Sequence, residues 1–414
     1  MKYIPYNIYL FGAALLFGAC ASGNDEEPDQ PVAGTTAPLT VYISLPQAGD
    51  SVQTRVGDPG TASGETQDWD RLVLIAAYKS KATGESIIDP NPGKMVYYDT
   101  FTKEEFDCRN ADNTVNTKGV EHSLSTLQPI LNADGTDSGI RSYTMYLPQG
   151  TVRTYGVTYS NGKLDMATAL DNIASDGNDH NADIVQMKIS NDYATTNATT
   201  DVAKFLSVAT GYGINAKDKD NPTPDLVVSL DNDSEMHEYW NMTLHRLAAK
   251  IDIQWDTYEA YNSQKNTYTK VEVDGFAYDG GSATLTSSDP AAGYGRLFPF
   301  KELLSATESF TPLGGKKTFV NTSAISKRNG RVYHYIFPDG SNTPTVSFSL
   351  NTEEAKKNAD GNTTSTETVK RTYTYDFSNV APLVPATWYK INTTVKGNSQ
   401  ENTTITIDKF NTGS

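Results

Sequence analysis

The chain has 414 residues and a formal net charge of −16, which argues against nucleic-acid binding because that function favours basic surfaces. Its length is sufficient for two domains that each bury a core of their own. Only two cysteines are present, so the fold must depend on its hydrophobic core rather than on disulfides.

The N-terminal segment has the pattern of an export signal. After Lys2, an apolar run over Leu10–Ala19 ends at small residues and Cys20, and this run is too short to span a membrane. The small residues before the cysteine predict a lipoprotein signal peptide over residues 1–20, with Cys20 as the acylated N-terminus. An ordinary secretory signal cleaved nearby is the alternative. Residues 21–38 are expected to form a disordered acidic tether.

A short strand is predicted next, in LTVYISLP. Its apolar residues alternate with polar ones, which is typical of a strand with one buried face. The apolar face consists of Leu39, Val41, Ile43 and Leu45. A Gly/Asp/Ser-containing linker follows and reaches Arg55, where a protease could gain access. The alternative is a permanent edge strand followed by an ordinary loop arginine.

The rest of the N-terminal half contains short alternating runs separated by turn-rich loops, as in β-sandwiches and barrels. Arg71–Tyr78 is apolar on both faces and is predicted to be a central strand. Apolar residues at helical spacing predict one helix within Lys163–Ile173. Further strands are expected at Arg141–Pro148, Thr154–Ser160, residues 205–213 and Asp225–Leu230.

The second half begins with the most regular alternation in the chain. His245–Asp256 is predicted to be one strand, with apolar residues on one face and Arg246, Lys250, Asp252 and Gln254 on the other. The polar stretch before it places a boundary between an N-terminal domain, 56–240, and a C-terminal domain, 241–414. Further strands are expected at Lys270–Tyr278, Arg331–Pro338, Val346–Leu350, Arg371–Phe377, Trp388–Val395 and Thr403–Phe410.

Residue patterns that carry catalysis are not found. The five histidines lack metal-ligand spacing, and no nucleophile elbow, phosphate loop or dinucleotide fingerprint occurs. We therefore expect no catalytic residue, no metal and no cofactor, and a protein that is not an enzyme. His245 and His334 are interpreted as structural residues of a sheet.

Three stretches rich in Asp and Asn raise the question of calcium, which prefers clustered oxygen ligands. They are Asn132–Gly139, Asp176–Asp183 and Asp231–Glu235. None of them matches the twelve-residue calcium loop with its closing glutamate. Since Asn, Asp and Gly also dominate plain turns, these stretches are predicted to be solvated turns.

Taken in order, these features resemble the fimbrillin (type V pilin) family of anaerobic Gram-negative bacteria. The resemblance rests on the signal ending at Cys20, the alternating strand with its linker to Arg55, and VGDPGTASGE before RLVLIAAY. LHRLAAKIDIQ at the domain junction and VPATWYKINTTVKG near the end complete the pattern. It extends over nearly the whole chain.

The resemblance implies an all-β fold of two tandem transthyretin-like β-sandwich domains, with a minor helix in the first. It also implies a precursor that reaches the outer membrane as a lipoprotein. An arginine-specific surface protease then cuts between Arg55 and Val56, and the strand within 39–55 is lost. A strand from another fimbrial subunit fills the groove, which places the mature protein in a fimbrium at the cell surface.

The C-terminal segment departs from the family pattern, because only a short sequence follows the last body strand. Ile405 and Ile407 alternate there, either in a donor strand or in the last strand of the chain's own sheet. We therefore expect a tip or accessory fimbrial subunit that supports adhesion. The alternative function is that of a monomeric lipid-anchored surface protein that binds glycans or host proteins.

Overall fold

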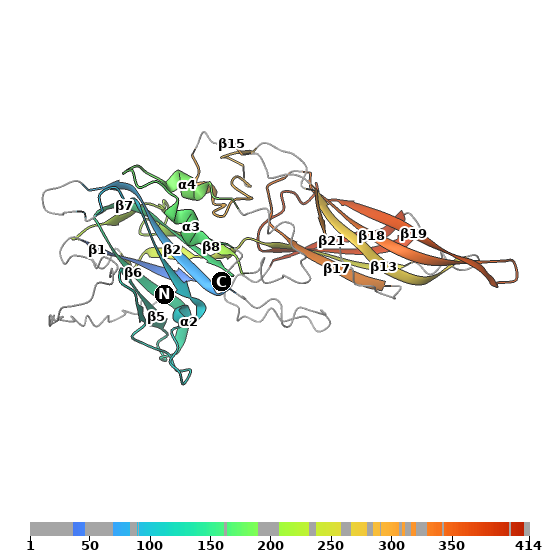
Figure 1. The fold of residues 1–414 in the computed structure, drawn as a ribbon, viewed down its shortest axis with the longest axis horizontal. Coiled ribbons are helices and arrows are strands. Elements are labelled where there is room, and N and C mark those ends of the chain that lie inside the picture. Colours follow the sequence, from blue (N-terminus) through green and yellow to red (C-terminus); the bar gives the residue numbers. More distant parts are fainter. Residues whose placement is uncertain are drawn as a thin grey trace.

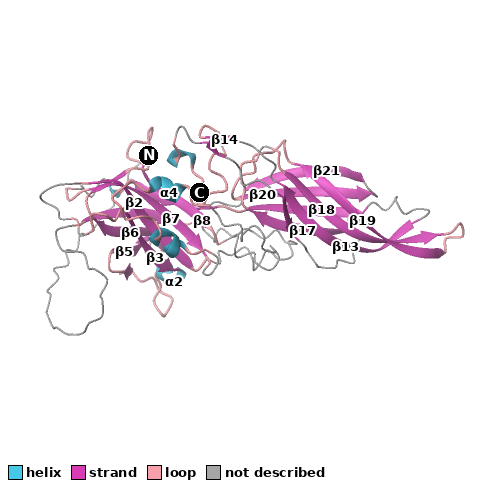
Figure 2. Cartoon of the chain, turned by 45° about the horizontal axis from the view of Figure 1, so that its top comes forward, coloured by secondary structure: helices cyan, strands magenta, loops and turns pink. Residues whose placement is uncertain are grey.

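The computed structural model of the chain describes residues 36–45, 69–82, 89, 91–160, 164–188, 207–231, 237–257, 266–279, 285–289, 291–305, 309–310, 316–319, 329–341, 343–396 and 399–409. Within these ranges strands predominate and helices are few and short, which confirms the predicted all-β class (Figure 2). Figure 1 shows two β-rich parts arranged along the long axis of the molecule.

The first part is built on one large sheet. Its strands follow the order β3-β2-β7-β8-β10-β1-β6-β5-β4, with β9 on β7 and β11 on β8. They are β1 (Ala37–Ser44), β2 (Arg71–Lys81), β3 (Val96–Thr102), β4 (Val120–Glu121), β5 (Ser125–Leu131), β6 (Asp137–Leu147), β7 (Gly150–Tyr159), β8 (Ala209–Asn215), β9 (Leu226–Val228), β10 (Trp240–Thr243) and β11 (His245–Arg246). The helices are α2 (Lys103–Asp107), α3 (Met166–Asp171) and α4 (Asn181–Val185).

This sheet folds over on itself to enclose a core. Leu39 of β1 and Leu72 of β2 belong to the same hydrophobic cluster, although three strands separate β1 from β2 in the sheet order. The other face of β2, which includes Val73, packs with α3 and α4 in a second cluster. The prediction that Arg71–Tyr78 is a strand buried on both faces is therefore confirmed.

The second part contains two four-stranded sheets, β17-β12-β20-β21 and β16-β13-β18-β19, and a small sheet of β14 and β15. Ile251 and Ile391 from the first sheet share a core with Phe348 and Tyr375 from the second, so the two sheets pack face to face. The elements are β12 (Ala249–Thr257), β13 (Asn266–Asp279), β14 (Leu285–Thr286), β15 (Ser309–Phe310), β16 (Lys316–Phe319), β17 (Asn329–Ile336), β18 (Thr345–Lys357), β19 (Thr363–Asp376), β20 (Thr387–Lys396), β21 (Ser399–Lys409) and the 3-10 helix η2 (Lys301–Leu303).

The prediction of one strand over His245–Asp256 is wrong. β11 ends at Arg246 and pairs with β8, whereas β12 begins at Ala249 and pairs with β17 and β20. Between them, Leu247 and Ala248 join the second cluster, which also contains residues from both parts. The chain therefore passes from the first part to the second at a packed junction rather than along a continuous strand.

The alternation predicted over Ala249–Trp255 is present, but the face that carries the polar residues is largely buried too. Lys250 and Asp252 are fully buried, and Arg246 is nearly so, while His245 lies on the exposed side. The Trp388 indole N–H donates to Asp252 at 3.0 Å, and the Lys250 ammonium lies 4.6 Å from the centre of the Trp388 ring. Strand alternation shows which residues share a face, but it does not show whether another element covers that face.

The predicted helix within Lys163–Ile173 is present as α3, whereas α2 and α4 were not predicted. Both have only five residues, too few to show a hydrophobic period. A capping box begins α2: the Thr102 hydroxyl accepts from the Glu105 N–H at 3.2 Å, and the Glu105 carboxylate accepts from the Thr102 N–H at 2.7 Å. Thr followed three residues later by Glu is the sequence signal that could have revealed this helix.

Candidate functional site

Strand β1 is the first described strand in the chain, yet it lies in the interior of the sheet (Figure 1). It pairs antiparallel with β6 over all eight of its residues and parallel with β10 over Tyr42–Ser44. Its neighbours have other partners, because β6 also pairs with β5 and β10 also pairs with β8. We call the space between β6 and β10 that β1 fills the β1 slot.

The side chains of β1 follow the predicted alternation. Leu39, Val41 and Ile43 are at most 1% exposed, and Leu45 is half-buried against the same core. The strand begins at Ala37, two residues before the predicted start, and Ala37 is buried too. Burying three large aliphatic side chains contributes about 5–9 kcal/mol in total, so β1 is a substantial part of the core.

Opposite these residues, β6 lines the β1 slot with the side chains of its own buried face. Ala37 faces Leu147, Leu39 faces Met145, Val41 faces Tyr143 and Ile43 faces Arg141. Directly opposed residues of an antiparallel pair lie on the same face, so each β1 side chain has a defined neighbour. The slot therefore fixes the register of whichever strand occupies it.

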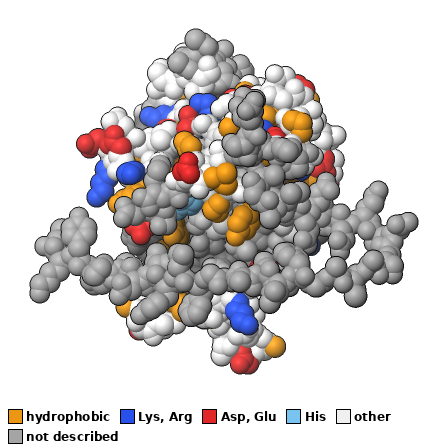
Figure 3. Space-filling model, turned by 90° about the vertical axis from the view of Figure 1, so that its left-hand side faces the viewer, with side chains coloured by type: hydrophobic (Ala, Val, Ile, Leu, Met, Phe, Trp, Pro, Cys, Tyr) orange, Lys and Arg blue, Asp and Glu red, His pale blue; other side chains and the backbone are white. Residues whose placement is uncertain are grey.

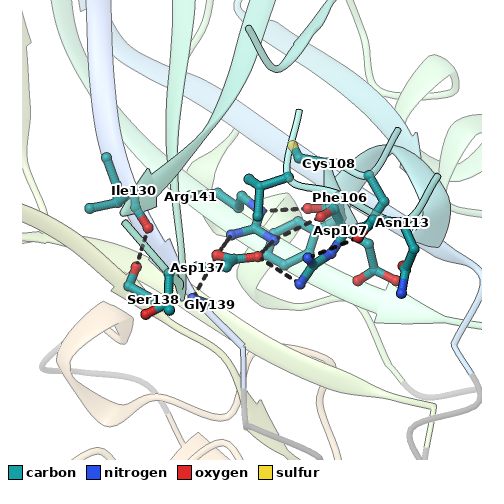
Figure 4. Close-up of polar contacts among 12 residues, drawn as sticks. Phe106, Asp107, Cys108, Asn113, Ile130, Asp137, Ser138, Gly139 and Arg141 are labelled. Carbon is teal, nitrogen blue, oxygen red and sulfur yellow. Dashed lines mark hydrogen bonds and ion pairs between the residues drawn. The ribbon is translucent and has the colours of Figure 1, made fainter. Parts of the chain in front are cut away.

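On β6, the buried Arg141 is the residue opposite Ile43, and Figure 4 shows its polar contacts. Its guanidinium donates to both carboxylate oxygens of Asp137, at 2.7 and 3.0 Å, and to the backbone carbonyls of Phe106 and Asp107 at the end of α2. Burial alone would raise the pKa of the Asp137 carboxyl, but the hydrogen bonds from Arg141 hold it below its usual value.

Arg141 was not singled out from the sequence. The available signal was that it is in phase with the apolar residues Tyr143, Met145 and Leu147 of β6. An arginine in phase with a buried face needs a partner, and Asp137 lies four residues earlier in the same strand.

The backbone N–H and C=O groups of β1 point alternately toward β6 and toward β10, the two flanks of the strand. On the β10 flank, the Ser44 carbonyl accepts from the Leu244 N–H at 3.0 Å, and the Thr40 N–H donates to Nδ1 of His237 at 3.1 Å. Pro38 is exposed and has no N–H to satisfy. The N-terminal half of β1 is therefore held in place by β6, its own side chains and His237.

His237 lies just before β10 and is 8% exposed. Its ring stacks on that of Trp240, with 4.3 Å between the ring centres and 30° between the planes. Burial lowers the pKa of the His237 imidazole. Because Nδ1 accepts the Thr40 N–H, the proton of the neutral ring lies on Nε2.

A second histidine, the half-buried His122, links α2 to β3. His122 lies between Asp99 of β3, at 2.9 Å, and Glu105 of α2, at 3.3 Å, and its ring stacks on Phe101. Burial lowers the pKa of His122, but the two carboxylates outweigh this and raise it. The Ser125 hydroxyl donates to Asp99 rather than to the imidazole, so these residues do not form a nucleophile–base pair.

The predicted site residues Cys20, Arg55 and Val56 lie outside the described residues. Ile405 and Ile407 lie in β21, where they pair with Ile391 and Tyr389 of β20. This segment, predicted either as a donor strand or as the last strand of the chain's own sheet, thus forms part of the chain's own sheet in the structure.

The Asp/Asn-rich stretches have local roles where they are described. Asn132–Thr136 forms the turn between β5 and β6, and the rest of that stretch, to Gly139, begins β6. Asp176–Asp183 contains His180, whose two ring nitrogens contact Asp176 and Asp183. Asp231–Glu235 lies almost wholly outside the described residues. In the described part of the chain, no group of three or more His, Cys, Asp or Glu side chains is placed to hold a metal.

A pocket of about 300 Å³ lies where the two parts meet. His245 of β11 lines it from the first part, and Tyr294, Phe300 and Thr387 line it from the second. A molecule bound there would contact both parts. Figure 3 shows a different surface, the end of the first part, where hydrophobic, acidic and basic side chains are interspersed.

None of the helices in the described ranges is long and apolar enough to cross a membrane. We found no family model and no curated protein that matches the chain.

Solved structures of similar fold include the tip fimbrial protein Mfa3 from Porphyromonas gingivalis, with 12% identity, a TM-score of 0.42 and coverage of 90% of this chain and 99% of that one. A candidate cell-adhesion protein from Bacteroides eggerthii matches with 10% identity, a TM-score of 0.40 and coverage of 92% and 97%. The fimbrial anchor protein Mfa2 from P. gingivalis matches with 10% identity, a TM-score of 0.34 and coverage of 90% and 98%. At these scores the likeness by itself assigns no function.

Proposed function

We propose that the chain is a structural subunit of a cell-surface fimbria, assembled by proteolysis-triggered strand exchange and supporting adhesion. One observation carries the proposal: β1 is terminal among the described strands but interior in the sheet. As the first described strand, β1 can leave the sheet without pulling another strand out with it. Its two neighbours, β6 and β10, each keep a second partner. Its departure would leave the backbone N–H and C=O groups of β6 unpaired beside an apolar slot. Such an exposed strand edge is a template for an incoming strand.

The proposed events begin with residues outside the described ranges. Cys20 carries the lipid that holds the precursor at the outer membrane. An arginine-specific surface protease cuts between Arg55 and Val56, which separates β1 from the rest of the chain. The strand of another fimbrial subunit then enters the slot. In this proposal the two parts are transthyretin-like β-sandwich domains; the boundary lies a few residues beyond the one between 56–240 and 241–414, because β10 and β11 still pair with β8.

We also propose a tip or accessory position for the subunit. The candidate donor segment with Ile405 and Ile407 is already paired with β20. A strand that completes its own sheet is not offered to a neighbour without breaking that pairing. This arrangement favours a subunit that accepts a strand over one that links two others in a stalk.

The decisive test is N-terminal sequencing and intact mass of the protein taken from the surface of the native cell. We expect a chain that starts at Val56 without lipid, and we expect Arg55→Ala to block both cleavage and assembly. Arg109→Ala, which changes an exposed arginine elsewhere in the chain, serves as the matched control and should leave both unchanged. A mature chain that still begins at lipidated Cys20 would refute the proposal.

The alternative is a monomeric lipid-anchored protein that binds glycans or host proteins, and the pocket between the two parts is the observation that favours it. Ring side chains such as Tyr294 and Phe300 offer apolar area suited to a sugar face. This alternative predicts retained lipid, a monomer in solution, and glycan binding that Phe300→Ala abolishes.

A further inference from the structure

One backbone N–H of β1 donates to a side chain, at a position where a neighbouring strand would normally offer a backbone carbonyl as the acceptor. β10 pairs with β1 only from Tyr42 onward. Two residues earlier on the same flank, the Thr40 N–H donates to Nδ1 of His237 at 3.1 Å. His237 thus extends the ladder of β10 by one acceptor, toward the N-terminal end of the slot.

The surroundings of His237 keep this acceptor in place. Its ring is stacked on Trp240, and the Thr40 hydroxyl is held at 2.8 Å from that of Thr144 on β6, which fixes Thr40 from the opposite flank. Among the described residues, the charged Glu238 is next in the chain, and burial together with Glu238 raises the pKa of Tyr42 of β1. Burial lowers the pKa of His237, which favours the neutral ring that can accept.

We propose that His237 is a specificity-determining residue of the β1 slot, which recognises a backbone N–H at the register of Thr40. Proline is then excluded at this register, although the same flank accommodates Pro38 two residues earlier. When the ring gains a second proton, Nδ1 becomes a donor that faces the Thr40 N–H, which is also a donor. The hydrogen bond is then lost, and β1 is bound less tightly. The consequence for subunit exchange rests on the proposed function, whereas the hydrogen bond itself does not.

The bond can be tested in the intact full chain by hydrogen–deuterium exchange of β1 between pH 7.5 and pH 5.5, corrected for intrinsic exchange rates. We expect protection of β1 to fall about tenfold in acid, because the native state holds the His237 ring neutral whereas the opened state lets it take up a proton near its ordinary pKa of about 6.5. His237→Phe keeps a ring without an acceptor and should show low protection without a pH step. His245→Phe, a matched change in β11, should behave like the wild type.

A pH step that persists in His237→Phe would overturn the inference. Since that variant could fail to fold, the nitrogen chemical shifts of the His237 ring in the wild type give an independent measurement. We expect the neutral ring to carry its proton on Nε2, and a proton on Nδ1 at pH 7.5 would overturn the inference.

Selection by the slot is tested on the chain cut at Arg55, with synthetic peptides of residues 36–45. We expect the peptide with Thr40→Pro to bind at least about tenfold more weakly than the one with Thr40→Ala, because only the former lacks the N–H. Equal binding of the two would refute selection at this register. If no peptide binds, the proposed strand exchange fails, while the exchange data on the intact chain still decide the role of His237.

Discussion

Leu39 offers the most direct test of whether β1 is part of the core of the first part. Its side chain is 1% exposed and shares a cluster with residues of β2, β3 and β6. Leu39→Ala removes buried carbon atoms and leaves a cavity that two opposed layers cannot readily close. Such substitutions cost 2–5 kcal/mol in general, and we expect about 3–5 kcal/mol here because the site is enclosed on both sides.

The free energy of unfolding can be measured by urea titration with tryptophan fluorescence, because Trp69 and Trp240 are both buried in this cluster. With slopes of about 1–3 kcal/mol per M, the midpoint should fall by at least about 1 M. Leu230→Ala is the matched control, since Leu230 is 49% exposed and its truncation should cost less than about 0.5 kcal/mol. Equal effects of the two substitutions would refute the placement of β1 in the core.

Three further predictions concern the polar contacts around the slot. Raising the pH through the elevated pKa of His122 should lower the urea midpoint, because the folded state gives up a proton that the two carboxylates hold. His122→Phe should reduce this slope and leave the part that comes from His180, whose pKa is also raised; an unchanged slope would contradict the reasoning. Arg141→Met should cost about 1–3 kcal/mol by thermal unfolding, since it leaves the partly buried Asp137 with Arg109 and the Gly139 N–H as partners and frees the carbonyls of Phe106 and Asp107, whereas Arg141→Met with Asp137→Leu should recover part of that loss. Thr102→Ala should cost about 0.5–2 kcal/mol by removing the cap of α2, and Thr102→Ser should cost less.

Much of the fold was predictable because strand alternation is a local property. The burial patterns of β1 and β2 can be read from the sequence. The alternation in β1 indicates one buried face, and the apolar run in β2 indicates two. Short helices such as α2 and α4 escaped prediction because they are held by caps and by packing rather than by a long apolar stripe. Lys250 and Asp252 lie on the predicted face, but alternation could not show that this face is buried, because the residue that covers it, Trp388, is remote in sequence.

In the candidate site, too, some features could be predicted from the sequence and others could not. The sequence by itself determined that Leu39, Val41 and Ile43 form one buried face, since period-two alternation follows from the geometry of a single strand. Only the tertiary structure decided that this strand lies between β6 and β10, that Arg141 lies opposite Ile43 and that His237 accepts the Thr40 N–H. These contacts join segments about 100 to 200 residues apart, and no local pattern records which distant segments meet.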